Sequence, residues 1–155
     1  MIGLIQRVSR ASVTVDGTCI AEIGPGLLAL VAVQHNDAAA QAKRLAERLL
    51  SYRVFPDAAG RMNRSLTDTG GELLVVPQFT LAADTRRGNR PSFTSAAPPE
   101  HGERLFRELL RQLDARDANV KSGRFGADMT VSLVNEGPVT FWLETGSGAP
   151  GEPTD

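Results

Sequence analysis

The segment Gly71–Phe93 contains the side chains best suited to bind a ligand. The apolar run Leu73–Val76 near its start is typical of a strand buried on both faces. Pro77 has no N–H to donate to a neighbouring strand, so it predicts the end of this one. The tripeptide Gln78–Thr80 then brings an amide, an aromatic ring and a hydroxyl to the point where the backbone leaves the sheet.

Three arginines, Arg86, Arg87 and Arg90, follow in a loop-forming segment. Guanidinium groups bind phosphate oxygens in a bidentate manner, and such contacts position a nucleic acid without reading its sequence. The strand end and this loop therefore indicate a site for an anionic ligand. The alternative is a core strand followed by a solvated loop, and this segment alone favours the alternative. Further cations are expected in other loops or at strand ends, namely Arg61, Arg64, Lys121 and Arg124.

Conventional catalytic groups are scarce in the sequence. Its 2 histidines, His35 and His101, lie near expected helix starts, and its single cysteine, Cys19, lies in an alternating apolar segment. No His and Cys pair has the spacing of metal ligands, so we expect neither a metal nor a cofactor. Thr80 is the one candidate nucleophile, but no base is evident beside it, and it could equally bond its own backbone at the strand end. A hydrolase of this kind would depend on backbone donors, geometry and groups of its substrate.

A second unusual feature is the Gly137–Pro138 pair between two expected strands. About 5–6% of X-Pro bonds in folded proteins are cis, so a trans turn is the simplest expectation. A cis bond here would place two carbonyl groups side by side as acceptors for an ammonium group.

The composition favours a single domain. The chain has 155 residues, 41% of them hydrophobic and 23% charged, which is ordinary for a globular protein. Its net charge of −1 gives no overall attraction to nucleic acid, and 5% aromatic residues argue against a base-stacking surface. No signal-like or membrane-spanning segment is evident, so we expect a cytoplasmic protein that does not associate with membranes.

These sites must be positioned by strands and helices in an α+β arrangement. The pattern predicts a four-stranded meander over residues 1–33, then a helix capped by Asn36 or Asp37, and a second helix introduced by Pro98 and Pro99. Further strands are expected at 129–134 and 139–143. The fold class is therefore α+β, a single domain with a largely antiparallel, barrel-like sheet and two main helices packed on it. Residues 145–155 lack apolar anchors and are expected to form a flexible tail.

Three colinear segments resemble the bacterial D-aminoacyl-tRNA deacylase family: MIGLIQRVSRASVTVDG, LLVVPQFTLAADTRRGNRPSF and SGRFGADMTVSLVNEGPVTFWL. The resemblance covers residues 1–144. Family motifs are Ser-Gln-Phe-Thr-Leu and Gly-Pro-Val-Thr, and the second is intact here as residues 137–140.

The resemblance implies a homodimeric proofreading enzyme of translation quality control that hydrolyses tRNA charged with a D-amino acid or glycine, with assistance from the RNA. Active sites would lie at the interface. Gly137 and Pro138, joined by a cis bond and inserted from the partner, would bind the α-amino group and exclude L side chains. Gln78, Phe79 and Thr80 would supply backbone N–H groups. The remaining residues that the resemblance places at the site are Arg7 and Met129, which brace the Gly-Pro loop, and Phe125, near the terminal adenosine.

Pro77 departs from the family motif, which has serine at this position. Pro77 removes a hydroxyl and an N–H from the pocket edge. A related animal enzyme that removes L-alanine from tRNA has proline here, so relaxed specificity for L-alanyl-tRNA is one alternative. A non-catalytic nucleic-acid-binding module on the same fold is another.

Overall fold

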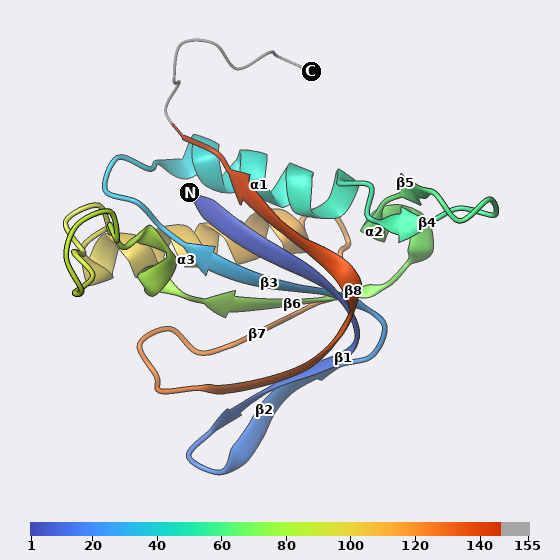
Figure 1. The fold of residues 1–155 in the computed structure, drawn as a ribbon, viewed down its shortest axis with the longest axis horizontal. Helices are drawn as coiled ribbons and strands as arrows, with labels where there is room; N and C mark the ends of the chain where they lie inside the picture. The colour runs from blue at the N-terminus through green and yellow to red at the C-terminus, as the bar shows by residue number, and fades with distance from the viewer. Residues whose placement is uncertain (147–155) are drawn as a thin grey trace.

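A mixed six-stranded sheet forms the centre of the protein in the computed structural model, which describes residues 1–146 (Figure 1). The strands follow the order β2-β1-β3-β6-β7, and β8 pairs with the free side of β1. β3 pairs with β6 and β6 with β7 in parallel, whereas all pairings of β1 are antiparallel. The strands of this sheet are β1 (Ile2–Val15), β2 (Thr18–Ile23), β3 (Gly26–Ala32), β6 (Glu72–Pro77), β7 (Val120–Ser122) and β8 (Thr130–Glu144).

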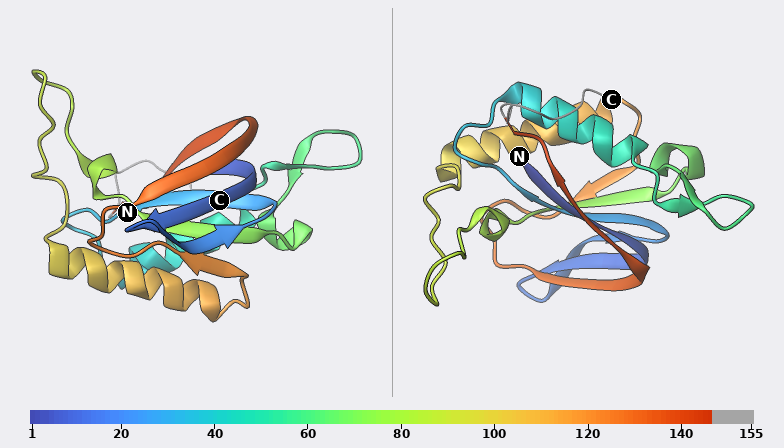
Figure 2. Two further views of the ribbon diagram at one scale, coloured as in Figure 1. Left: turned by 90° about the horizontal axis from the view of Figure 1, so that it is seen from below. Right: turned by 45° about the horizontal axis from the view of Figure 1, so that its top comes forward.

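The sheet curls where β1 changes partners along its length. The first half of β1 pairs with β3, the second half pairs with β2, and β8 follows β1 over nearly its whole length. Figure 2 shows the resulting nearly barrel-shaped sheet. The predicted meander of four strands over residues 1–33 is wrong in one respect, because residues 2–15 form one 14-residue strand. The two strands expected around Gly137–Pro138 are likewise one 15-residue strand.

Two amphipathic helices, α1 (Ala39–Ser51) and α3 (Pro99–Asp114), cover one face of the sheet (Figure 1). Each buries a stripe of apolar side chains at helical spacing, as the sequence predicts. The predicted fold class is therefore confirmed, with the parallel pairs as an addition. The small elements are β4 (Phe55–Pro56), β5 (Met62–Arg64), α2 (Leu66–Thr69) and the 3₁₀ helix η1 (Phe79–Ala82).

The predicted cap of α1 is wrong. The N-cap residue is Ala38, and the side chain of Gln41 accepts a hydrogen bond from its N–H. Asp37 instead accepts hydrogen bonds, through its buried carboxylate, from the α-amino group of Met1 (2.7 Å) and the N–H of Gln34 (2.6 Å). It therefore ties the start of β1 to the connection that follows β3.

Strand β6 is buried on both faces, which confirms the prediction for Leu73–Val76. Leu73 and Val75 pack with α1 and α3, while Leu74 and Val76 pack against the curled half of the sheet. All four side chains have 0% exposure. The curl of the sheet supplies the second apolar layer that such a strand needs.

The C-terminal part of the described chain is anchored at Thr145. Its N–H donates to the carbonyl of Met1 (2.8 Å), its hydroxyl donates to the carbonyl of Gln41 (3.2 Å), and the residue is buried. Thr145 is therefore part of the fold rather than the first residue of the predicted tail. Residues 147–155 lie outside the described residues. Over residues 1–146, no helix has the length and apolar character needed to cross a membrane.

Gly26 offers a test of the parallel β3–β6 pair. A Cβ atom at Gly26 would lie 1.8 Å from the carbonyl oxygen of Glu72, so the two strands would have to separate. We expect Gly26→Ala to lower the free energy of unfolding by ~3 kcal/mol in urea denaturation. Gly24→Ala is the matched control, because its nearest contact is an ordinary 3.5 Å. Equal stability of the two variants would contradict this account.

Candidate functional site

A cleft of about 660 Å³ opens where the parallel strands β3, β6 and β7 end. The carboxyl ends of parallel strands are a common place for ligand sites, because the chain leaves the sheet there in loops. The volume is within the range of small-molecule pockets. Its walls come from the strand ends, the start of α3 and the segment after β7, and its lining includes Pro77, Gln78, Phe79, Phe125 and Met129.

Five of the predicted site residues therefore meet at one cleft. Phe125 packs against Phe106 of α3, with ring centroids 6.2 Å apart, and these rings form part of its apolar wall. Gly102 leaves room for the Phe125 ring beside α3, since a Cβ atom at Gly102 would lie only 3.3 Å from that ring. A glycine inside a helix is the sequence signal of such a close approach.

The backbone at the start of η1 presents two free donors. The N–H of Gln78 donates to the carbonyl of Val31 (2.7 Å) and so belongs to the sheet. Within residues 1–146, the N–H groups of Phe79 and Thr80 have no acceptor. The expectation that all three residues donate to a ligand is therefore wrong for Gln78. The remaining pair is suited to bind a developing negative charge on an oxygen.

The hydroxyl of Thr80 is not arranged as a nucleophile. Its described hydrogen-bond partner is the side-chain amide of Gln78, which donates to Thr80 Oγ1. An amide cannot accept the hydroxyl proton as a general base does. In the described chain the Thr80 side chain is therefore bonded to its neighbour Gln78 at the strand end.

Pro77 ends the pairing of β6 with β7. The N–H of Gly123 still donates to the carbonyl of Val75 (2.9 Å), but Pro77 has no N–H to continue the ladder. The chain after β7 turns away and brings Met129 to the cleft. A Cβ at Gly123 would lie 2.8 Å from Met129 Sδ and 3.2 Å from Pro77 Cδ, so these three residues pack closely together.

Two exposed aromatic rings mark the outer edge of the cleft. Phe79 is 58% exposed and Phe93 is 42% exposed, and their centroids lie 5.3 Å apart. The sequence does not mark Phe93 as a site residue, because its place beside Phe79 depends on the course of residues 84–92 between them, which we call the arginine loop. An antiparallel bridge between Asp84 and Ser92 closes that loop.

The arginine loop contributes two unpaired cations rather than three. Arg86 forms a bidentate ion pair with Asp84, with distances of 2.9 and 2.7 Å. Hydrogen bonds from the Arg86 side chain lower the pKa of Asp84 to about 2, so the pair persists at neutral pH. Arg87 and Arg90 have no carboxylate partner in the described part of the chain. They remain free to meet an external anion.

Gly137 and Pro138 lie away from the cleft of their own chain. The bond between them is cis. They fall between Asn135 and Thr140, which pair with β1 near the start of β3, whereas Gln78 follows the opposite end of β3. The strand spacings imply a separation of roughly 15–20 Å. Both residues are exposed.

Arg7 supports residues 136–139, an irregularity of β8 that lies opposite it and that we call the Gly-Pro loop. Its Nη1 donates to the carbonyl of Val54 (2.7 Å) and its Nε to the carbonyl of Glu136 (3.1 Å). The side chain of Asn135 donates to the carbonyls of Arg7 (2.9 Å) and Val139 (3.1 Å). Arg7 therefore links the carbonyls of Val54 and Glu136, and Met129 lines the cleft.

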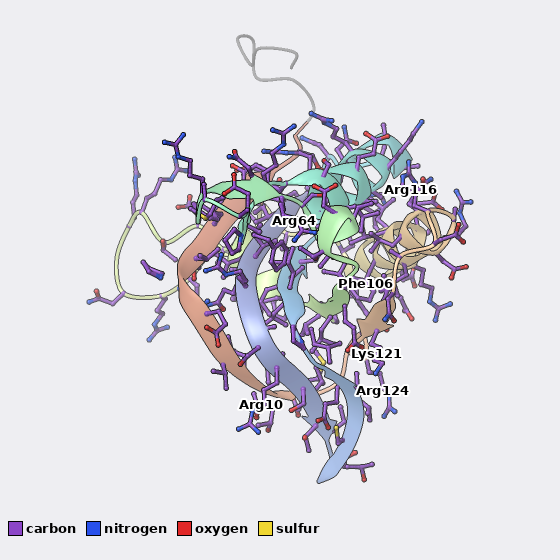
Figure 3. All side chains as sticks on the ribbon, turned by 90° about the vertical axis from the view of Figure 1, so that its right-hand side faces the viewer. Arg10, Arg64, Phe106, Arg116, Lys121 and Arg124 are labelled. Carbon is purple, nitrogen blue, oxygen red and sulfur yellow. The ribbon has the colours of Figure 1, made fainter. Side chains whose placement is uncertain are left out.

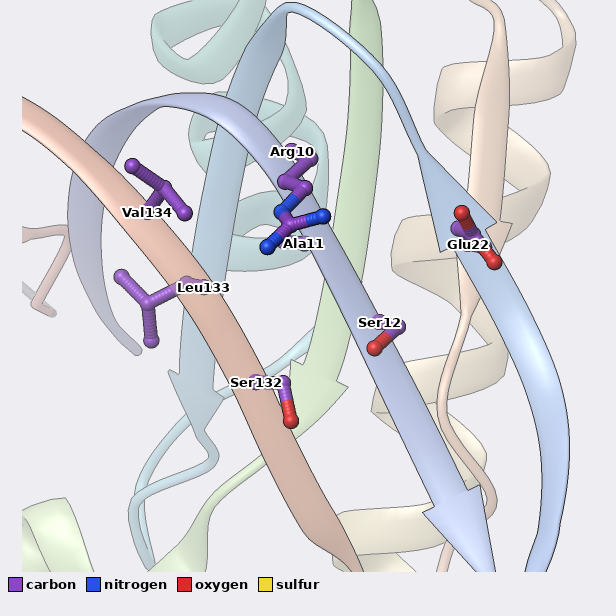
Figure 4. A pocket seen from close by; sticks show the side chains of 7 residues that line it. All are labelled: Arg10, Ala11, Ser12, Glu22, Ser132, Leu133 and Val134. Carbon is purple, nitrogen blue, oxygen red and sulfur yellow. The ribbon is translucent and has the colours of Figure 1, made fainter.

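A smaller depression lies on the outer face of β1, β2 and β8 (Figure 4). Its volume is about 290 Å³, and its lining includes Arg10, Glu22 and Leu133 but none of the predicted site residues.

Two further predicted cations are Lys121 of β7 and Arg124, which follows that strand (Figure 3). Lys121 is engaged, since it donates to the carbonyl of Glu22 (2.6 Å). Within residues 1–146 no three His, Cys, Asp or Glu side chains are grouped as metal ligands.

Comparison with known proteins identifies the family. A family model described as D-Tyr-tRNA(Tyr) deacylase matches residues 4–144. D-aminoacyl-tRNA deacylases of Alkalilimnicola ehrlichii and Xanthomonas oryzae pv. oryzae (strain MAFF 311018) are 62% and 63% identical over 144 residues. These alignments span 93% and 92% of this chain and 96% and 99% of theirs.

Solved structures agree in fold. A structure described as c-Myc DNA Unwinding Element Binding Protein has a TM-score of 0.90 at 39% identity, over 95% of this chain and all of that one. A probable eukaryotic D-amino acid tRNA deacylase has a TM-score of 0.78 at 17% identity, over 92% of this chain and 97% of that one, which supports the fold alone. On the strength of the matching model and its close relatives, the chain belongs to the D-Tyr-tRNA(Tyr) deacylase family of hydrolases.

Proposed function

We propose that this protein hydrolyses the ester bond between a D-amino acid and the terminal ribose of tRNA, in the cytoplasm. The observation that carries the proposal is a pair of free N–H groups, one from Phe79, which lines an apolar cleft, and one from Thr80, the next residue in the chain. The high identity to relatives named D-aminoacyl-tRNA deacylase supports the substrate class.

In this mechanism the protein binds and polarises the ester, and the RNA assists the chemistry. Water adds to the ester carbonyl, and the N–H groups of Phe79 and Thr80 stabilise the negative oxygen. The bond to the ribose oxygen then breaks, and that oxygen takes a proton, with the neighbouring ribose hydroxyl assisting. The products are a D-amino acid and intact tRNA. An aminoacyl ester is activated, so positioning and electrostatics supply the remaining rate enhancement.

In this proposal, a second subunit supplies the groups that distinguish D- from L-amino acids. Gly137 and Pro138 lie far from their own cleft, so they can reach a cleft only on another copy of the chain. Their carbonyl groups would accept from the substrate ammonium and leave no space for an L side chain. Glycine has no side chain to exclude, so glycyl-tRNA is a second substrate.

The surface around β8 supports a dimer. Leu133, Val134 and Trp142 of this strand are 36%, 40% and 49% exposed. Large apolar side chains left exposed along a strand can mark a protein interface. Arg87 and Arg90, which lack carboxylate partners in the described chain, would contact phosphates of the tRNA at the edge of the cleft.

Two other functions are alternatives to this proposal, and the experiments described below distinguish them from it. Pro77, at the serine position of the family motif, favours a deacylase with relaxed specificity for L-alanyl-tRNA. The name of the 39% identical structure, a DNA unwinding element binding protein, favours a nucleic-acid-binding module. A module of this second kind would bind tRNA without hydrolysing it.

The substrate is tested by single-turnover hydrolysis of matched D-tyrosyl-, L-tyrosyl- and L-alanyl-tRNA. We expect rapid loss of the D ester, with both L esters left at their uncatalysed rates. Cleavage of L-alanyl-tRNA would instead establish the relaxed enzyme. Binding of tRNA without cleavage of any ester would establish the binding module.

The role of Thr80 is tested by separating its side chain from its backbone. Thr80→Ala removes one neutral hydrogen bond worth ~1 kcal/mol, so kcat should fall less than about fivefold. A backbone ester at position 80, which removes only the N–H, should lower kcat by roughly 100-fold. A loss of several orders of magnitude in Thr80→Ala would contradict the RNA-assisted mechanism.

Dimerisation is tested by light scattering combined with activity. We expect twice the mass of the chain at concentrations where the protein is active, and a fall in specific activity on dilution below the dimer dissociation constant. A monomer that keeps full D-specific activity would show that Gly137 and Pro138 act without a partner.

A further inference from the structure

A basic hairpin projects from the body of the protein on the side away from the arginine loop (Figures 1 and 2). It comprises residues 53–64, with β4 and β5 as its two short strands, and we call it the basic hairpin. Arg53, Arg61 and Arg64 are all exposed and face no carboxylate within 4.0 Å in the described chain. Figure 3 shows Arg64 near the base of the hairpin.

The acidic groups around the hairpin are occupied by local structure. Asp57 accepts hydrogen bonds from the N–H groups of Ala59 (2.9 Å) and Arg61 (3.0 Å) and from the Asn63 side chain (2.9 Å). Asp68 accepts from the N–H of Ser65 (2.8 Å) at the start of α2. The carboxylates therefore fix the shape of the hairpin. The guanidinium group of Arg64 donates to the carbonyl of Asp68 (2.9 Å), whereas those of Arg53 and Arg61 remain available in the described chain.

The base of the hairpin is tied to the Gly-Pro loop. Arg7 donates to the carbonyl of Val54, at the hairpin base, and to the carbonyl of Glu136, next to Gly137. One side chain thus holds both segments together. The basic hairpin must therefore lie next to the Gly-Pro loop in any complex that the loop forms.

We propose that the basic hairpin of one subunit binds phosphate groups of the tRNA whose charged end lies in the partner's cleft. This inference rests on the proposed function. If Gly137 and Pro138 enter the partner's cleft, the hairpin flanks that cleft. A cleft of about 660 Å³ has room for little more than the aminoacylated terminal nucleotide, so the rest of the RNA must pass over the surfaces around it.

Each cleft would then be bordered by two basic surfaces. Its own chain supplies Arg87 and Arg90, and the second copy supplies its basic hairpin, with Arg53 and Arg61. Guanidinium groups on a preorganised hairpin bind phosphates with little loss of conformational freedom. Such contacts act on the affinity for the RNA and leave the ester chemistry unchanged.

The first test compares a long and a short substrate with the double variant R53A/R61A. With full-length D-tyrosyl-tRNA we expect KM to rise about tenfold at unchanged kcat. The salt dependence of KM should weaken by roughly 0.7–0.9 in logarithmic slope for each phosphate that the variant no longer binds. With D-tyrosyl-adenosine, which has no phosphate, both constants should equal those of the wild type.

Two further variants serve as controls. R53K/R61K keeps both charges and should retain most of the affinity. R44A/R107A removes the same charge from exposed arginines that already pair with Glu47 and Glu103 on the two helices, and should leave KM unchanged. If KM rises equally in R53A/R61A and R44A/R107A, the loss of affinity follows from net charge alone, and the proposal is overturned.

Mixed dimers decide which cleft the hairpin serves. One subunit carries Phe79→Asp, which places a charge at its own cleft edge and inactivates it. If R53A/R61A is added to this inactive subunit, we expect KM to rise, because the tRNA in the active cleft contacts that subunit's hairpin. If the pair is added to the active subunit, KM should stay normal. The reverse pattern, or no difference, overturns the proposal.

Failure of this inference is distinguishable from failure of the proposed function. If wild-type protein hydrolyses D-tyrosyl-adenosine and D-tyrosyl-tRNA but R53A/R61A matches it on both, only the hairpin proposal falls. If the wild type cleaves neither ester, the proposed function falls, and the hairpin proposal falls with it.

Discussion

The parallel pairing of β6 between β3 and β7 determines where the cleft forms. Because these strands run in the same direction, their carboxyl ends meet at one edge, and the chain must leave the sheet there. Gly26 permits the close approach of β3 and β6, since any side chain would meet the Glu72 carbonyl. Pro77 then stops the β6–β7 ladder and lets the following segment form a wall. The position of the cleft is thus a consequence of backbone hydrogen bonding.

The second constraint is the curl of the sheet. Strand β1 exchanges one partner for another along its length, so the strand β8 beside it also bends. This bend carries Gly137 and Pro138 to the end of the sheet opposite the cleft, and Arg7 fixes them there. A chain whose two distinctive segments are held apart by a rigid sheet cannot join them by a local movement. The proposal of a site shared between two copies rests on this separation.

The elements that the sequence predicted best were those set by local periodicity. Both main helices and the buried strand Leu73–Val76 followed from the spacing of apolar residues. The errors came from long-range effects. Residues 2–15 were divided because their alternation is interrupted, yet pairing with three neighbours makes them one strand. Asp37 was predicted as a cap because of its type, but the α-amino group of Met1, distant in sequence, binds it instead.

The sequence by itself determined the residue types at the site and the family, because the two motifs and their flanking segments are contiguous in the chain. It also indicated a site without a conventional nucleophile, since no base accompanies Thr80. Only the tertiary structure decided which donors are free. The N–H of Gln78 is used by Val31, and Arg86 by Asp84, whereas Phe79 and Arg87 stay available in the described chain. Hydrogen-bond partners are chosen by the approach of distant segments, and a pattern along the chain does not contain that information.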